Sequence, residues 1–263
     1  MTAAATSNPF DLSGRTALVT GGSRGLGLQM ARALGGQGAR VILSARKVHE
    51  LQAATAELSA LGIDASWIVA DVSREDDITA LTAASLQRAD GRIDILVNNA
   101  GNSWGAAAED YPTDGWDRVF NLNVRGQFLL TRNLTKQGMI PARYGRVINI
   151  ASIGGLQGTM PDVMRAIAYN SSKGALINFT RALAAEWAHY GITVNALAPG
   201  FFPSTLTNGL IDAVGNARMT ANVPMGRLGG DDDLTGPVLM FAAESSRYVT
   251  GQVLAVDGGA SVV

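Results

Sequence analysis

Cysteine is absent from this chain of 263 residues, and histidine occurs only as His49 and His189. Without cysteine the chain forms no disulfide, uses no thiolate nucleophile and offers no sulfur ligand to a metal. Two histidines far apart in the sequence are also poor material for a histidine-rich metal site or a serine–histidine hydrolase. The acidic run at 231–233 is more typical of a helix cap than of a metal site. We therefore expect no bound metal.

A strong net charge and long apolar runs are missing as well. The formal net charge is −1 at pH 7, which argues against nucleic-acid binding and against a polybasic membrane surface. No apolar run approaches the roughly 20 residues of a membrane span. The first fifteen residues lack the cationic and then apolar order of a secretory signal. These features predict a cytoplasmic protein that binds neither nucleic acid nor membrane.

Short apolar runs alternate with stretches of helical spacing along the whole chain. The runs lie at 15–20, 39–46, 65–72, 93–101, 145–152, 192–200 and 251–259, and the longest helical stretches at 112–139 and 168–191. Apolar runs without strict alternation indicate strands that are buried on both faces. The pattern predicts an α/β fold in one domain, 1–263: a doubly wound, seven-stranded parallel sheet of the Rossmann type with helices on both faces. A ligand is expected beyond the carboxyl ends of the strands.

A glycine-rich loop, TGGSRGLG at 20–27, lies between the first expected strand and the first helix. Gly21, Gly25 and Gly27 permit a tight turn, a close backbone approach to a pyrophosphate, and close packing of the helix on the sheet. The free N–H groups of the helix start would then face the phosphates. A plain glycine-rich turn is the alternative, but the loop falls at the junction that a dinucleotide site requires.

The end of the second expected strand indicates which dinucleotide is preferred. An NAD site usually places an acid there, on the ribose hydroxyls. Here the strand ends in LSARK, with Ala45 and Arg46 at the place of the acid, and Arg24 lies inside the glycine loop. Arginine pairs well with a 2′-phosphate. The sequence therefore favours NADP(H) over NAD(H).

Six motifs occur in an order that resembles the short-chain dehydrogenase/reductase family over nearly the full length. They are TGGSRGLG, NNAG at 98–101, NLNVRG with Asn123, INIAS with Ser152, YNSSK at 169–173, and APG at 198–200. Within the family, the chain resembles the branch of 3-oxoacyl reductases and gluconate 5-dehydrogenases. The stretch between Ser152 and Tyr169 is longer than is usual in the family.

Tyr169 and Lys173 are one helical turn apart and so share a helix face. A free phenol has a pKa of about 10, and a nearby ammonium, aided by the positive nicotinamide of an oxidised cofactor, lowers the pKa of a phenol. The resemblance implies that Tyr169 is the acid–base group, that Lys173 also binds the nicotinamide ribose, and that Ser152 orients the substrate carbonyl. It implies that Asn123 helps to hold a water that relays protons to the lysine. The expected reaction is the reduction of a carbonyl or the oxidation of a secondary alcohol.

The family motifs also imply the residues that bind the cofactor. These are Gly21, Ser23, Arg24, Gly25, Leu26, Gly27, Arg46, Asp71, Val72, Asn98, Ala100, Gly101, Tyr169, Lys173, Pro199, Gly200, Phe202 and Ser204.

The substrate is less constrained by the sequence than the chemistry is. In the family, the region corresponding to about 201–230 is a lid over the substrate, and here it is strongly apolar. An apolar lid favours a 3-oxoacyl group or another apolar ketone. A sugar acid or polyol of the gluconate type is the alternative, and reduction of steroid or xenobiotic ketones follows it. A catalytically silent dinucleotide sensor is a remote possibility, since such proteins typically lose the tyrosine or the lysine.

The sequence bears on two kinds of macromolecular partner. Acyl carrier protein is acidic and would need a basic patch, which Arg125, Arg132, Arg143 and Arg146 could supply, although the near-neutral charge gives this little support. Family resemblance also implies a homotetramer, in which the long helices around Asn123 and Tyr169 pack across a two-fold axis.

Overall fold

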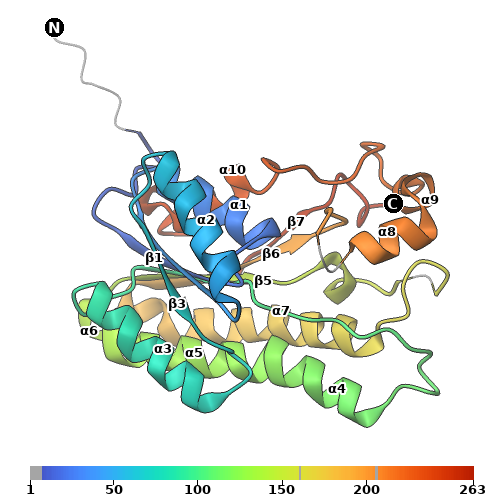
Figure 1. The fold of residues 1–263 in the computed structure, drawn as a ribbon, viewed down its shortest axis with the longest axis horizontal. Coiled ribbons are helices and arrows are strands. Elements are labelled where there is room, and N and C mark those ends of the chain that lie inside the picture. The colour runs from blue at the N-terminus through green and yellow to red at the C-terminus, as the bar shows by residue number, and fades with distance from the viewer. Residues whose placement is uncertain (1–7, 160, 205–206) are drawn as a thin grey trace, which may run out of the picture.

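Seven parallel strands form one continuous sheet in the computed structural model, which describes residues 8–159, 161–204 and 207–263 (Figure 1). Residues 1–7, and 205 and 206 of the expected lid, lie outside the described residues. The strand order is β3-β2-β1-β4-β5-β6-β7, which confirms the predicted fold class. The strands are β1 (Thr16–Thr20), β2 (Arg40–Ala45), β3 (Ala65–Val69), β4 (Ile95–Asn98), β5 (Gly145–Ile150), β6 (Ile192–Pro199) and β7 (Val253–Val256).

Helices cover both faces of the sheet (Figure 1). One face carries α1 (Gly25–Gly36), α2 (Val48–Ala60) and α10 (Thr235–Ala242). The other carries α3 (Glu75–Arg88), α7 (Ile167–Trp187) and a long helix that begins at residue 113. Two short helices, α8 (Asn208–Val214) and α9 (Asn216–Thr220), lie beside the carboxyl terminus in Figure 1. Single 3-10 turns occur at η3 (Ile153–Gly155), η4 (Ala188–Tyr190) and η5 (Glu244–Ser246).

The apolar strands are buried because successive side chains enter cores on opposite faces. Val19 and Leu43 belong to the core beneath α1, α2 and α10, whereas their neighbours Leu18 and Ile42 belong to the core on the other face. All four side chains are fully buried. Side chains alternate in direction along a strand, so a strand covered on both faces needs apolar residues at every position. This is the reason for the unbroken apolar runs in the sequence.

The long helix differs from the regular helix that the sequence predicts at 112–139. Its segments are α4 (Thr113–Phe120), η1 (Asn121–Gly126), α5 (Gln127–Leu134), η2 (Thr135–Met139) and α6 (Ile140–Ala142), and both η segments have the wider π-helical turn. Apolar spacing alone does not reveal π turns, which are often found at functional sites. The first π turn contains Asn123.

The same π turn is pressed against the loop that follows β3. A Cβ atom built on Gly126 would lie 1.9 Å from the carbonyl oxygen of Val72. The Asn121 side chain donates a hydrogen bond of 2.9 Å to the carbonyl oxygen of Ser73. Glycine at 126 therefore lets the helix hold the 71–73 loop at the carboxyl edge of the sheet.

None of the helices in the described ranges combines the length and the apolar character that crossing a membrane demands.

We expect Gly126→Ala to destabilise the fold by about 1–3 kcal/mol, because the backbone must move to admit the new methyl group. The measurement is urea denaturation followed by circular dichroism. Gly36→Ala, in α1, is the matched control, since a Cβ there meets nothing within 4 Å and alanine favours helix by about 1 kcal/mol. Equal stability of the two variants would contradict this account of the helix–loop contact.

Candidate active site

The glycine loop makes the sharp turn that the sequence predicts. Gly21 and Gly25 have φ angles of 62° and 53°, in the left-handed region that favours glycine. A Cβ on Gly27 would lie 2.3 Å from the carbonyl oxygen of Gly21. The Asn99 amide donates to the carbonyl oxygens of Thr20, at 2.9 Å, and Gly21, at 3.1 Å. The loop is thus tied to the end of β4, beside the point where the strand order reverses.

A cavity of about 330 Å³ opens between this loop and the ends of β2, β3 and β4. Helix α1 begins here without a side-chain cap, so its first N–H groups are available to an anion. Both the glycine turn and the uncapped helix fit a dinucleotide pyrophosphate. Eleven of the predicted cofactor residues line the cavity: Gly21, Ser23, Arg24, Gly25, Leu26, Arg46, Asp71, Val72, Ala100, Gly101 and Ser204.

Three further predicted cofactor residues are buried and do not line this cavity. Gly27 packs closely against the backbone of Gly21 in the loop. Asn98 is fully buried, and its amide donates to Thr131 Oγ1, at 2.8 Å, and to Asn149 Oδ1, at 2.9 Å. Pro199 ends β6 in a buried position. Backbone atoms of these residues shape the edge, while the side chain of Asn98 is committed to the core.

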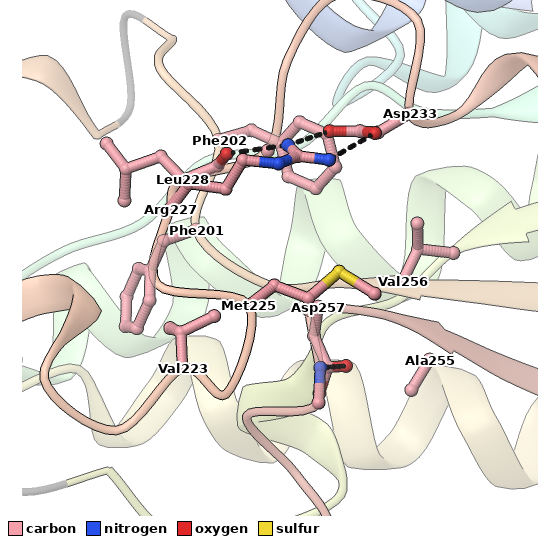
Figure 2. Close-up of a pocket in the computed structure, with 13 residues that line it drawn as sticks. Phe201, Phe202, Val223, Met225, Arg227, Leu228, Asp233, Ala255, Val256 and Asp257 are labelled. Carbon is pink, nitrogen blue, oxygen red and sulfur yellow. Dashed lines mark hydrogen bonds and ion pairs between the residues drawn. The ribbon is translucent and has the colours of Figure 1, made fainter.

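Phe202 and Gly200 lie beside other cavities. Phe202 is buried beneath Gly229, where an added Cβ would come within 2.4 Å of its ring. It lines a separate cavity of about 360 Å³, in which Arg227 pairs with Asp233 (Figure 2). Gly200 lines the cavity that contains Tyr169.

Asp233 serves the structure of the loop before α10. Its carboxylate accepts hydrogen bonds from Arg227 and from the N–H of Gly230. The bond from Arg227, together with the Gly230 N–H, lowers the pKa of Asp233 to about 2. Within residues 8–159, 161–204 and 207–263, no three acidic or histidine side chains are grouped to hold a metal ion.

The sequence reasoning missed Asn99, Lys47 and Glu50, which also line the cavity at the glycine loop. Asn99 follows directly after Asn98. Because side chains alternate in direction along a strand, the sequence could have indicated that one of the two points into the core and the other toward the cavity. Lys47 and Glu50 stand at the start of α2, three residues apart. Their position after Arg46, at the end of β2, was the signal that could have found them.

Tyr169, Lys173, Ser152 and Asn123 come together at the carboxyl edge, as the motifs predict. Tyr169 and Lys173 lie on α7, with the Lys173 ammonium 5.5 Å from the centre of the Tyr169 ring. Ser152 follows β5 and hydrogen bonds to Tyr169. Gly101 connects the group to the first cavity, since a Cβ there would lie 3.2 Å from Asn123 Oδ1 and 3.7 Å from Lys173 Nζ.

Burial dominates the electrostatics of the pair on α7. It raises the pKa of the Tyr169 phenol above its ordinary value, although the hydrogen bond with Ser152 opposes the change. This direction differs from the predicted lowering by Lys173. The Lys173 ammonium donates a 2.6 Å hydrogen bond to the carbonyl oxygen of Ile150, and burial lowers its own pKa to about 8. Within the protein alone, Tyr169 is therefore a protonated donor at neutral pH.

The Asn123 side chain is fully occupied by protein groups. Its Oδ1 accepts from the N–H of Asn102, at 2.9 Å, and its amide donates to the carbonyl oxygen of Asn102 and to Ser172 Oγ, at 2.9 and 3.0 Å. Asn123 thus ties the loop after β4 to α7.

The cavity at Tyr169 has a volume of about 460 Å³, and Ser152 and Tyr169 both line it. Its apolar lining comes from the loop after β5 and from the expected lid: Ile153, Val163, Met164, Phe201, Met219 and Val223. Arg218 is the one charged side chain among its described lining residues, and its guanidinium pairs with Asp162. Tyr169 can therefore present its hydroxyl to a molecule bound among apolar groups.

Two of the four arginines that could supply a basic patch for acyl carrier protein are paired with carboxylates. Arg146 is only 2% exposed and pairs with Glu244 at 2.9 Å. Arg125 pairs with Glu75 at 2.6 Å. Arg132 and Arg143 remain as candidates for a basic patch. Arg132 lies in α5, whereas Arg143 follows the end of α6.

Comparison with known proteins agrees with this geometry. The family model described as enoyl-(acyl carrier protein) reductase matches residues 21–261. The chain is 41% identical to the rhamnolipids biosynthesis 3-oxoacyl-[acyl-carrier-protein] reductase of Pseudomonas aeruginosa, over 95% of this chain and 97% of that protein. It is 37% identical to gluconate 5-dehydrogenase of Gluconobacter oxydans, over 96% and 97%.

Solved structures give the same assignment. The Pseudomonas aeruginosa RhlG/NADP active-site complex matches with a TM-score of 0.90 and 39% identity, over 97% of this chain and 99% of that one. The chain belongs to the short-chain dehydrogenase/reductase family, and it is an oxidoreductase that acts on CH–OH groups.

The buried Lys173 predicts how stability changes with pH. Its pKa falls from the ordinary 10.5 to about 8 on folding, so the unfolded chain binds more protons between these pH values. Stability of the native protein should therefore rise relative to Lys173→Met, by about 2 kcal/mol from pH 8 to pH 9.5. Urea denaturation of both proteins at several pH values measures this difference. A difference that stays constant across the range would contradict the lowered pKa.

Proposed function

We propose that the chain is an NADPH-dependent carbonyl reductase, which also catalyses the reverse oxidation of a secondary alcohol, and that its substrate is a 3-oxoacyl compound or another apolar ketone. The observation that carries the proposal is the position of Tyr169. Tyr169 lines the apolar cavity, and Lys173, one turn further along α7, lies beside Gly101 in the wall of the cavity at the glycine loop. Relatives named 3-oxoacyl reductase and ketoacyl reductase support the substrate class.

The cofactor proposal is NADP(H) in preference to NAD(H). Arg24, Arg46 and Lys47 line the end of the cavity next to β2, and arginine matches a phosphate geometrically. The solved RhlG relative carries NADP. When bound, the nicotinamide supplies or accepts the hydride, and the chain has the tasks of binding, orienting and moving a proton.

Each catalytic side chain has a distinct task in this proposal. The Ser152 hydroxyl holds the substrate oxygen beside Tyr169, and the phenol donates its proton to that oxygen as reduction proceeds. Lys173 places a positive charge near the resulting phenolate and stabilises it. Asn123 is a positioning residue, since it fixes the loop after β4 against α7.

A sugar acid is the second candidate substrate, and Arg218 is the observation that favours it. Its guanidinium stands at the wall of the apolar cavity, where it could bind a carboxylate if it separated from Asp162. Gluconate 5-dehydrogenase among the relatives supports this alternative.

A panel of 3-oxoacyl esters, sugar acids and cyclic ketones, each with NADPH and with NADH, tests both proposals. We expect the highest kcat/KM with an apolar ketone and NADPH, measured by absorbance of the reduced nicotinamide. Arg218→Met should leave this activity within about twofold, because no charge on such a substrate requires the guanidinium. A preference for sugar acids that Arg218→Met abolishes would favour the second candidate, and a preference for NADH would refute the cofactor assignment.

Tyr169→Phe should lower kcat by at least about 10²-fold with the preferred substrate, because the proton donor is lost. NADPH affinity and the thermal melt should change little, since only one hydroxyl is removed. Single-turnover NADPH oxidation and calorimetric binding measure the two effects separately. Tyr248→Phe, at a fully exposed tyrosine, is the control. Normal hydride transfer in a folded Tyr169→Phe protein would refute the role of Tyr169.

We also propose a homotetramer. The long helix exposes Trp116 and Phe128, and the Phe128 ring lies 6.3 Å from the ring of Phe179 on α7. These aromatic groups give the two helices a shared apolar surface, which is typical of an interface. Sedimentation velocity at micromolar concentration should give a tetramer mass, and Phe128→Glu should shift it toward smaller species. A monomer for the native chain would refute the assembly.

A further inference from the structure

The cofactor cavity contains a carboxylate at the end where the proposed 2′-phosphate would bind. Glu50, in the first turn of α2, accepts three hydrogen bonds from three donors. They come from Ser23 Oγ at 3.2 Å, from Arg24 Nη1 at 2.8 Å, and from Lys47 Nζ at 2.9 Å. Its side chain is 19% exposed, whereas those of Arg24 and Lys47 are about half exposed. One anion thus occupies the point on which the donors converge.

Glu50 is charged at neutral pH. The hydrogen bond from Lys47, with further help from Arg24 and Ser23, holds the pKa of its carboxyl below the ordinary value. Arg46 is a third cation in the lining of this cavity. No hydrogen bond or ion pair joins it to another group in the part of the chain that the structure describes. Two cations, Arg24 and Lys47, therefore pair with one carboxylate, and Arg46 lines the same cavity.

This arrangement has two possible consequences for a phosphate-bearing ligand. Glu50 could hold Arg24 and Lys47 in the positions that a phosphate needs. Alternatively, it could compete with the phosphate for the same donors and repel it. The second effect should prevail, because all three donors already point at the carboxylate and a phosphate placed on them would come next to a like charge.

The geometry points to Glu50 as an internal competitor for the 2′-phosphate subsite, and therefore as a residue that sets the selectivity between NADP(H) and NAD(H). This inference rests on the proposed dinucleotide function. Binding a 2′-phosphate requires that Arg24, Lys47 and Ser23 release the carboxylate. Binding a ligand without that phosphate leaves the contacts in place. Glu50 thus weakens NADP(H) binding and leaves NAD(H) binding almost unaffected.

Calorimetric titration of the full chain tests the inference with two pairs of ligands, 2′-AMP against 5′-AMP and NADP⁺ against NAD⁺. Glu50→Gln keeps the size of the side chain and removes its charge. We expect this variant to bind 2′-AMP and NADP⁺ about five- to tenfold more tightly than the native chain. Binding of 5′-AMP and NAD⁺ should stay within about twofold.

Glu57→Gln is the matched control, because Glu57 lies on the same helix and pairs with Arg32 outside the cavity. It should change none of the four affinities, and a thermal melt of each variant verifies folding. Unchanged or weaker binding of 2′-AMP and NADP⁺ to folded Glu50→Gln would overturn the inference. If the native chain and both variants bound none of the four ligands, the dinucleotide function itself would be refuted, and the inference with it.

Discussion

The reversal of strand order between β1 and β4 is the constraint on which the rest of the structure depends. From β1 the chain proceeds outward through β2 and β3, and then returns to place β4 on the other side of β1. The connections after β1 and β4 therefore diverge and leave a crevice at the carboxyl edge. The glycine loop turns into this crevice, and the Asn99 amide holds it there through Thr20 and Gly21.

The two ends of the proposed site have opposite electrostatic designs. Around Tyr169 the environment is dry, and burial works against charge on both the phenol and the Lys173 ammonium. This keeps the proton on the phenol until charge in the site favours its release. At the other end, Arg24, Lys47 and Glu50 remain charged and partly exposed. A single ligand that spans both ends would meet a charge-rich subsite and a charge-poor one.

Sequence reasoning predicted the seven strands, the order of the motifs and the meeting of Tyr169, Ser152 and Lys173, because each depends on local spacing or on a recognisable motif. The burial of Arg146, one of four candidates for a basic patch, could not be foreseen from the sequence. Arginine in a strand has the composition of a surface residue, but here it is buried and paired with Glu244, 98 residues further along the chain. The spacing of residues along the sequence does not reveal an ion-pair partner so far away in the chain. Burial raises the pKa of Tyr169 in the protein alone, and sequence spacing does not reveal this, because burial depends on all the surrounding segments.

The sequence by itself determined the parallel α/β architecture, the glycine loop and the residue types of the proposed catalytic group. Apolar periodicity specifies which faces must be buried, and that requirement is local. Only the tertiary structure decided that Asn98 turns into the core while Asn99 faces the cavity, and that Asn123 ties a loop to α7. It also decided that Glu50 meets Arg24. These outcomes depend on distances between segments far apart in the chain, which are set when the helices pack against the sheet.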